Sequence, residues 1–197
     1  MLRLITKATQ KIEYWAPSTK LLYHITSRYY REVIGNEVDL ASITANDEVL
    51  FIGGGFCPFS AILLHQTTGA KITVTDNDSD CIPRAVKAIS QLELGDCIHI
   101  QCRDGACPNF DLSQFSVVHF ALQITPLNQV FAEVERRVNP GTRLLVRRPK
   151  NHLDKMYCKF SNAVVGCCRY VRHGSMSNIG VTQLYIKQKP SVARIAA

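Results

Sequence analysis

The stretch Val49 to Leu64, VLFIGGGFCPFSAILL, contains an apolar run, three consecutive glycines and a second apolar run that follows a proline. The first run predicts a buried strand and the second predicts a helix. Gly53 and Gly55 allow positive φ and let backbone N–H groups approach a ligand, while the helix start adds a partial positive charge. We therefore expect a strand, a tight turn and a helix, with the turn facing a ligand.

Strand-like and helix-like segments alternate after this stretch. Residues 48–53, 70–76, 97–102, 115–122 and 142–148 are expected strands, and residues 58–68, 79–94 and 126–138 are expected helices. Strands that alternate with helices of this length predict a doubly wound α/β domain whose mostly parallel sheet is covered on both faces.

The C-terminal part breaks this alternation. We expect a helix from Leu153 to about Val164, followed by strands in residues 166–173 and 181–188. The loop between these two strands is too short for a helical crossover, so the pair is expected to be antiparallel. The complete sheet then has seven strands and ends in an antiparallel hairpin.

The N-terminal residues are expected to be helical. After Pro17 and Ser18, apolar residues from Leu21 to Ile34 recur near helical spacing, which predicts an amphipathic helix capped by Ser18 or Thr19. No repeat or linker interrupts the chain. We therefore expect a single domain over residues 1–197, with a helical cap in 1–46 and a ligand-binding domain in 47–190.

Charge is unevenly distributed along the chain. The net charge is +7, and residues 141–197 hold eleven Lys and Arg but one acid, Asp154. A basic end of this kind suits an anionic partner such as a nucleic acid or a phosphorylated metabolite. Because no nucleic-acid-binding motif accompanies the charge, a solvated basic face is favoured over a nucleic-acid site.

Neither a membrane nor a metal is expected. The chain has no apolar run of about 18 residues and no export signal at its start, which predicts a cytoplasmic protein. Its eight cysteines are then expected to be thiols. Cys97, Cys102, Cys107 and the pair Cys167 and Cys168 provide no Cys-x-x-Cys spacing for zinc.

Acidic residues follow the second and third expected strands. Asp76 ends the second strand about twenty residues after the glycine turn, where a carboxylate accepts hydrogen bonds from a ribose. Asn77 and Asp78 follow it, whereas Asp80 is expected to cap the next helix. Asp104 follows the third strand at the same edge of the sheet, and suits an adenine amino group.

These segments resemble the Rossmann-like (class I) S-adenosylmethionine-dependent methyltransferases. The resemblance covers about residues 49–187 and depends on FIGGG, VTDND, CRDGA and VNPGTRLLVR in that order. It implies that residues 47–190 form a domain that binds S-adenosylmethionine as its cofactor. The cofactor-binding residues that it implies are Gly53, Gly54, Gly55, Asp76, Asn77, Asp104, Gly105, Ala106, Ala121 and Leu122.

The motifs are more closely similar to those of the nicotianamine synthases, which transfer the aminocarboxypropyl arm of the same cofactor. IGGGFCPFSAILL matches that family's Gly-x-Gly followed by proline and a small hydroxyl residue, here Pro58 and Ser60. FALQI, LLVRR and SNIGVTQLYIK also fit its layout. Those enzymes have a larger N-terminal helical region than the segment that precedes the first strand here.

The sulfonium of this cofactor is already electrophilic, so the protein mainly positions an acceptor and removes its proton. No Asn-Pro-Pro-Tyr signature follows the fourth strand, which disfavours an amide-like or adenine nitrogen acceptor. Tyr23, His119 and Arg147 are weak catalytic candidates. Further acceptor-side candidates are Tyr14, His24, Tyr29, Tyr30 and Gln123, although aromatic residues on the first helix and a histidine within a strand are more often core residues.

Three functions remain open from the sequence. The first, which is favoured, is methyl transfer from S-adenosylmethionine to a small-molecule acceptor, and the second is transfer of the aminocarboxypropyl group to an amine. The third is a protein without catalytic activity that binds an anionic partner through its basic final third. The sequence also leaves a homodimer open.

Overall fold

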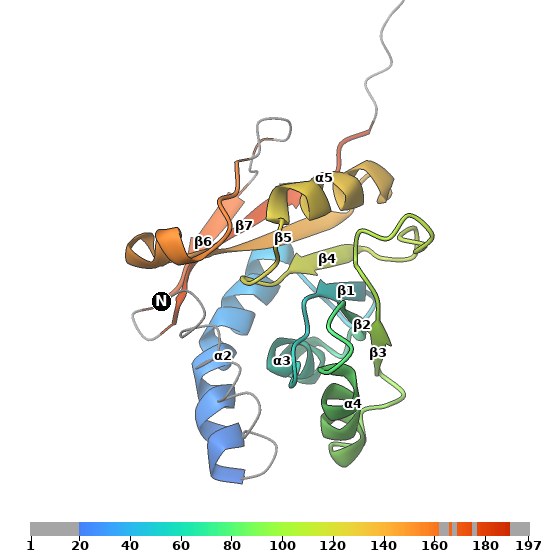
Figure 1. Ribbon diagram of the computed structural model, residues 1–197, viewed down its shortest axis with the longest axis vertical. Helices are drawn as coiled ribbons and strands as arrows, with labels where there is room; N and C mark the ends of the chain where they lie inside the picture. Colours follow the sequence, from blue (N-terminus) through green and yellow to red (C-terminus); the bar gives the residue numbers. More distant parts are fainter. Residues whose placement is uncertain (1–19, 162–165, 167–168, 175–176, 190–197) are drawn as a thin grey trace, which may run out of the picture.

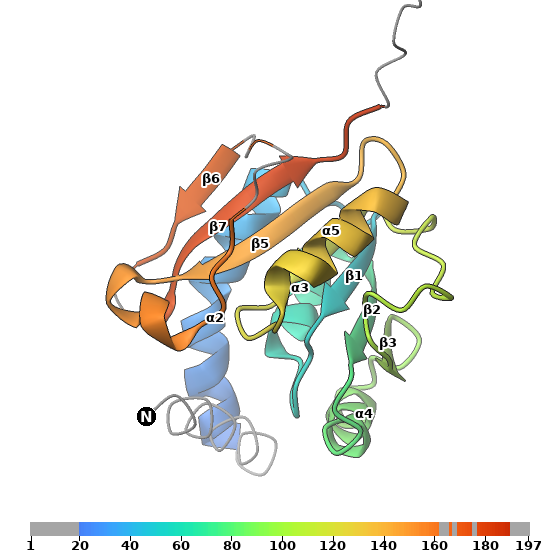
Figure 2. The ribbon, with the colours of Figure 1, turned by 45° about the horizontal axis from the view of Figure 1, so that its top comes forward.

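A mixed sheet of seven strands forms the centre of the protein, in the order β3-β2-β1-β4-β5-β7-β6 (Figure 1). The computed structural model describes residues 20–161, 166, 169–174 and 177–189. Six strands run in one direction, and β7 runs antiparallel to its neighbours β5 and β6 (Figure 2). The predicted parallel sheet with a C-terminal antiparallel hairpin is therefore confirmed. The strands are β1 (Glu48–Ile52), β2 (Lys71–Asp76), β3 (Ile98–Cys102), β4 (Val117–Phe120), β5 (Arg143–Pro149), β6 (Arg169–Arg172) and β7 (Ile179–Ile186).

Helices cover both faces of this sheet. Helices α2 (Lys20–Ala41), α3 (Phe59–Thr68) and α4 (Ile82–Gln91) lie below the sheet in Figure 1, and α5 (Leu127–Arg137) lies above it. Each face has its own apolar core, one around Ile34, Ile62 and Ile72 and the other around Phe120, Phe131 and Val134. The expected doubly wound arrangement is confirmed.

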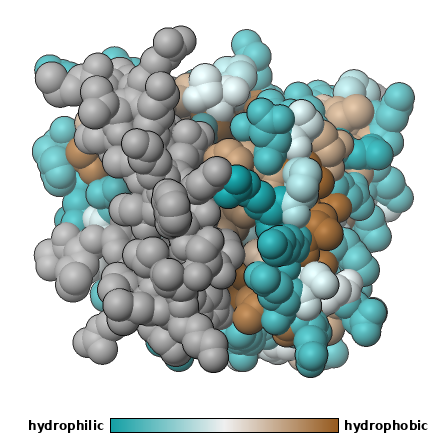
Figure 3. Space-filling model, turned by 60° about the horizontal axis from the view of Figure 1, so that its bottom comes forward, coloured by the Kyte–Doolittle hydropathy of each residue, from teal (hydrophilic) through white to brown (hydrophobic). Residues whose placement is uncertain are grey.

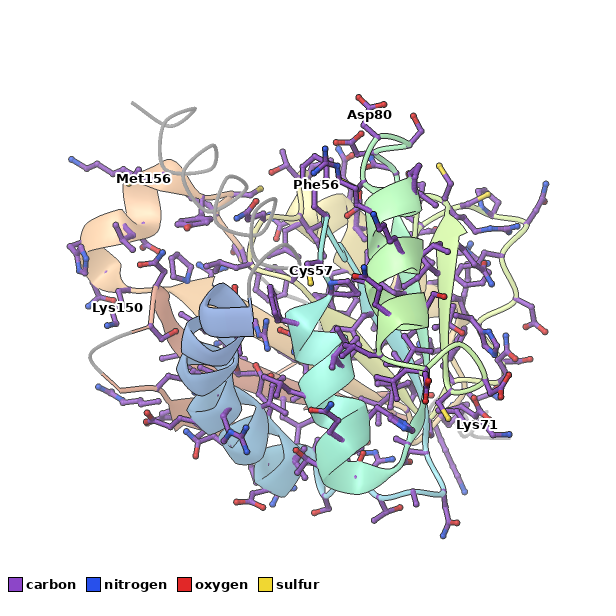
Figure 4. All side chains as sticks on the ribbon, turned by 90° about the horizontal axis from the view of Figure 1, so that it is seen from below. Phe56, Cys57, Lys71, Asp80, Lys150 and Met156 are labelled. Atoms are coloured by element: carbon purple, nitrogen blue, oxygen red, sulfur yellow. The ribbon has the colours of Figure 1, made fainter. Side chains whose placement is uncertain are left out.

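The chain reverses its direction across the sheet at β1. Strand β1 pairs with β2 on one side and with β4 on the other, so the loops that leave β1 and β4 diverge at their carboxyl ends. Figure 4 shows Lys71, the first residue of β2, at one end of the helical layer and Phe56, Cys57 and Asp80 at the other. Ligands of open α/β sheets bind at a switch point of this kind.

The helix expected over residues 153–164 is wrong for its described part. Residues 151–156 form a short 3-10 helix, η2 (Asn151–Met156), and residues 157–161 are irregular. Phe160 packs its ring against Phe131 and Tyr185, with ring centroids 5.1 and 5.9 Å apart. These contacts hold the chain on the second core, and packing overrides the weak helical preference of the segment.

The remaining boundaries agree with the expectation to within a few residues. The expected cap at Ser18 or Thr19 lies outside the described residues. None of the helices in the described part is long and apolar enough to cross a membrane. Figure 3 shows hydrophobic side chains scattered between hydrophilic ones on the visible part of the helical face.

Candidate functional site

The glycine turn joins β1 to α3 in the conformation that its residues allow. Gly53 has φ +88° and Gly55 has φ +62°, which confirms the expected positive φ at both positions. A Cβ atom on Gly54 would lie 2.3 Å from Cγ1 of Val74 in β2, and one on Gly53 would lie 3.0 Å from Cβ of Ala121. The turn therefore needs glycine both for its backbone angles and for close contact with the neighbouring strands.

A cavity of about 720 Å³ opens at this turn. Its wall is formed by the carboxyl ends of β1 and β2 and the loop that follows β4, together with residues from α2, α3 and β5. All of the cofactor-binding residues predicted from the sequence line it except Ala106, and so does Arg147. These residues, which are distant in sequence, therefore lie along one cavity.

Asp76 connects the second strand to the glycine turn. The Gly55 N–H donates to Asp76 Oδ2 over 2.7 Å, and the Asp78 N–H donates to Asp76 Oδ1 over 3.0 Å. The carboxylate is half-buried at the cavity wall. Each carboxylate oxygen has a further lone pair, so both oxygens are able to accept a hydroxyl donor from a ligand.

Asp104 and Gly105 line the same side of the cavity. The Ala106 N–H donates to Asp104 Oδ1 over 2.9 Å, so Ala106 stabilises the turn at Asp104 although it does not line the cavity itself. A Cβ atom on Gly105 would lie 2.7 Å from the side chain of Ile52. Gly105 is therefore required for packing against β1.

The expected helix cap at Asp80 is wrong. The N-cap residue of α4 is Cys81, which makes no side-chain capping bond. Instead, Asp78 accepts hydrogen bonds from the Asp80 N–H over 3.0 Å and from the Cys81 thiol over 3.4 Å. The turn before the helix is thus closed by the earlier aspartate, and Asp80 is exposed.

The cavity wall also includes a group of residues from other elements, namely Tyr30, Ser60, Arg147, Tyr157, Asn178 and Ile179. Arg147 is 4% exposed and donates from Nη1 to the Ser60 hydroxyl oxygen over 2.8 Å. Its guanidinium carbon lies 5.9 Å from the ring centroid of Tyr30. The next residue, Arg148, points to the opposite face of the sheet, where its guanidinium lies over the Phe160 ring.

A buried carboxylate, Glu37 of α2, holds Arg147. Arg147 donates from Nε and Nη2 to the two Glu37 oxygens, each over 2.8 Å. Burial alone would raise the pKa of Glu37. The Arg147 charge and the hydrogen bonds from Arg147 and His119 outweigh this effect, so the pKa of Glu37 lies well below its usual range. Glu37 is not among the residues predicted from the sequence. A signal existed, because Glu37 shares a helical stripe with the buried Val33, Ile34 and Ala41.

His119 does not line the cavity. It is fully buried in β4, stacks on Phe51 and lies with Nε2 3.0 Å from Glu37 Oε2. Burial lowers the pKa of His119, and the nearby Glu37 carboxylate offsets this only in part. A neutral His119 donates from Nε2 to Glu37, which makes it a core residue of the kind that the sequence favoured. The third candidate, Tyr23, lies in α2 outside the described side chains.

Comparison with known proteins identifies the fold. The chain has the fold of the class I S-adenosylmethionine-dependent methyltransferases, as its similarity to solved structures shows. A scan against protein-family models and a search of curated proteins give no match.

Two solved structures illustrate this similarity. A mutant of the nicotianamine synthase MtNAS in complex with S-adenosylmethionine has a TM-score of 0.82 and 22% identity, and the alignment covers 95% of this chain and 76% of MtNAS. An RNA methyltransferase from Salinibacter ruber in complex with S-adenosyl-L-homocysteine has a TM-score of 0.64 and 17% identity, with 84% and 96% of the two chains covered.

Proposed function

We propose that this chain is an S-adenosylmethionine-dependent transferase. The observation that carries the proposal is the arrangement of Gly55 and Asp76, in which a positive-φ turn and a carboxylate on the next strand meet at the switch point of the sheet. The fold neighbours in complex with S-adenosylmethionine or S-adenosyl-L-homocysteine support it. The cavity volume also falls within the range of small-molecule sites, about 300–1,000 Å³.

The residues of the cavity fit the parts of this cofactor. Asp76 would accept hydrogen bonds from the ribose hydroxyls, and Asp104 with Gly105 would flank the adenine. Gly53 to Gly55 would contact the amino-acid arm, and Ser60 and Arg147 line the same cavity. The bound cofactor supplies an electrophilic carbon on its sulfonium, so the residues of this chain have to bind, orient and exclude water.

Between the two transfers, we propose the aminocarboxypropyl group and a small amine acceptor. The similarity to MtNAS covers more of this chain, at a higher TM-score, than the similarity to the RNA methyltransferase. The motif with Pro58 and Ser60 favours the same transfer. Methyl transfer, which the sequence favours, is the second candidate, because the alignment with the RNA methyltransferase covers 84% of this chain.

The released nucleoside tests the proposal. The chain would be incubated with S-adenosylmethionine and a panel of amines, and the nucleoside identified by mass spectrometry. Methylthioadenosine is expected for aminocarboxypropyl transfer and S-adenosylhomocysteine for methyl transfer. Cofactor binding without either product would favour a binding protein, and the absence of cofactor binding would contradict the proposal.

A further inference from the structure

The carboxylate of Glu37 is fixed from three strands at once. Besides the two bonds from Arg147 in β5, it lies 3.0 Å from His119 Nε2 in β4 and accepts from the Thr182 hydroxyl in β7 over 2.6 Å. Glu37 itself is 0% exposed. Its oxygens therefore have one arrangement in the folded protein, and this arrangement connects helix α2 to the sheet.

The contact with Glu37 in turn fixes the position of the Arg147 guanidinium. A free arginine side chain has four flexible torsions, but the bidentate contact with Glu37 sets both the place and the plane of the guanidinium. The remaining terminal nitrogen then reaches Ser60 at the start of α3, 2.8 Å away. Thus Glu37, Arg147 and Ser60 form a chain of contacts from the core to the cavity wall.

The direction of the last hydrogen bond determines what Ser60 offers to a ligand. A guanidinium only donates, so the Ser60 oxygen accepts from Arg147 and its own proton is directed elsewhere. Ser60 is half-buried and lines the cavity. A hydroxyl that accepts from a cation is also a stronger donor, because successive hydrogen bonds polarise one another.

We propose that Glu37 is a positioning residue of this cavity. Through Arg147 it orients the Ser60 hydroxyl to donate to the carboxylate on the amino-acid arm of an S-adenosyl ligand. The inference rests on the proposed function, because it assumes that such a ligand occupies the cavity. On this proposal, the part of the wall around Ser60 and Arg147 distinguishes ligands that carry the amino-acid arm from ligands that lack it.

The test compares two nucleosides on a set of variants. S-adenosylhomocysteine carries the arm and methylthioadenosine lacks it. Affinity for both would be measured by calorimetry on the wild type, Glu37→Gln, Arg147→Met, the double variant and Ser60→Ala, together with the melting temperature of each. Asp47→Asn is the matched control, since Asp47 also pairs with an arginine of β5, Arg143, but does not line the cavity.

We expect Glu37→Gln to weaken the affinity for S-adenosylhomocysteine more than tenfold and to change the affinity for methylthioadenosine less than threefold. If Glu37 acts through Arg147, the double variant binds S-adenosylhomocysteine as weakly as Arg147→Met does, and melts above Glu37→Gln because it buries no unpaired charge. Asp47→Asn should melt lower with unchanged affinities. Wild-type affinity in Glu37→Gln, or losses that add in the double variant, would overturn the proposal.

A nucleoside-independent measurement separates this inference from the proposed function. If the wild type binds neither nucleoside, the proposed function fails, and nuclear magnetic resonance of the arginine Nε–H groups then tests the positioning alone. An Arg147 Nε–H signal that is protected from exchange with solvent in the wild type and is lost in Glu37→Gln supports the positioning role of Glu37. The same signal in both proteins would show that Glu37 does not hold Arg147.

Discussion

At the scale of single residues, the glycine turn combines two requirements. Gly53 and Gly55 adopt positive φ, which a side chain disfavours, and Gly54 lies against Val74 where a side chain does not fit. The expectation from sequence emphasised access for a ligand. The structure adds that Gly54 is needed for the contact between the turn and β2, so this position affects both folding and binding.

Substitution of Gly54 by alanine tests this requirement. The new Cβ would lie 2.3 Å from Val74 Cγ1, so the turn or the strand has to move. We expect a loss of about 1–3 kcal/mol in the free energy of unfolding, as for other overpacked sites. Urea unfolding measures it. Gly95→Ala is the control, because a Cβ there meets nothing within 4 Å, and an equal loss in both variants would contradict the account.

At the scale of elements, helix α2 is attached to the sheet by polar contacts as well as by apolar packing. Thr182 of β7 donates to Glu37, and His173 Nε2 lies 2.8 Å from the same hydroxyl oxygen. Thr182 is fully buried, so its hydroxyl has protein partners in place of water. The hairpin of β6 and β7 thus contributes to the position of the helix that borders the cavity.

Thr182→Val removes this hydroxyl and keeps the shape of the side chain. We expect the free energy of unfolding to fall by about 1–3 kcal/mol, because Glu37 and His173 each lose a buried partner. Chemical denaturation of the variant measures the change. Thr73→Val in β2, a half-buried position, serves as the control and should change stability by less than about 1 kcal/mol. Equal effects would mean that the Thr182 hydroxyl contributes nothing specific.

Periodicity in the sequence was sufficient to predict most of these helices and strands, but not all of them. Alternating apolar runs and glycine or proline boundaries predicted every strand of the described sheet, because such runs have few other ways to bury their side chains. The segment after β5 was misassigned, since Phe160 is held by Phe131 and Tyr185, which are distant in sequence. The Glu37 contacts were missed for the same reason, because they join four elements that local patterns do not relate.

At the scale of the whole molecule, part of the uneven charge is balanced inside the fold. Arg147 pairs with Glu37, Arg143 with Asp47 and Lys187 with Glu135, so basic residues of the final third meet acids from the earlier parts of the chain. The charge count along the sequence suggested an anionic partner. These pairs account for some of that charge without a partner.

Buried titratable groups also predict how stability depends on pH. Burial lowers the pKa of His119 and of His173, so the unfolded chain takes up protons first as the pH falls below about 6.5. The lowered pKa values of Glu37 and Asp47 act in the same direction below about pH 4.5.

We therefore expect the free energy of unfolding to be largest above pH 7 and to fall in two stages, first below pH 6.5 and then below pH 4.5. Urea unfolding at a series of pH values measures both stages. His173→Gln should reduce the first stage, because it removes one of the two histidines. Stability that is constant from pH 7.5 to pH 5, or that rises on acidification, would contradict the assignment of neutral buried histidines.

The central claim is that the glycine turn and Asp76 together bind an S-adenosyl ligand, and calorimetric titration with S-adenosylhomocysteine tests it most directly. We expect the wild type to bind, Asp76→Ala to bind at least tenfold more weakly because a charged hydrogen-bond acceptor is lost, and Asp80→Ala to bind as the wild type does, since Asp80 does not line the cavity. No binding by the wild type, or equal affinities for Asp76→Ala and Asp80→Ala, would contradict the account.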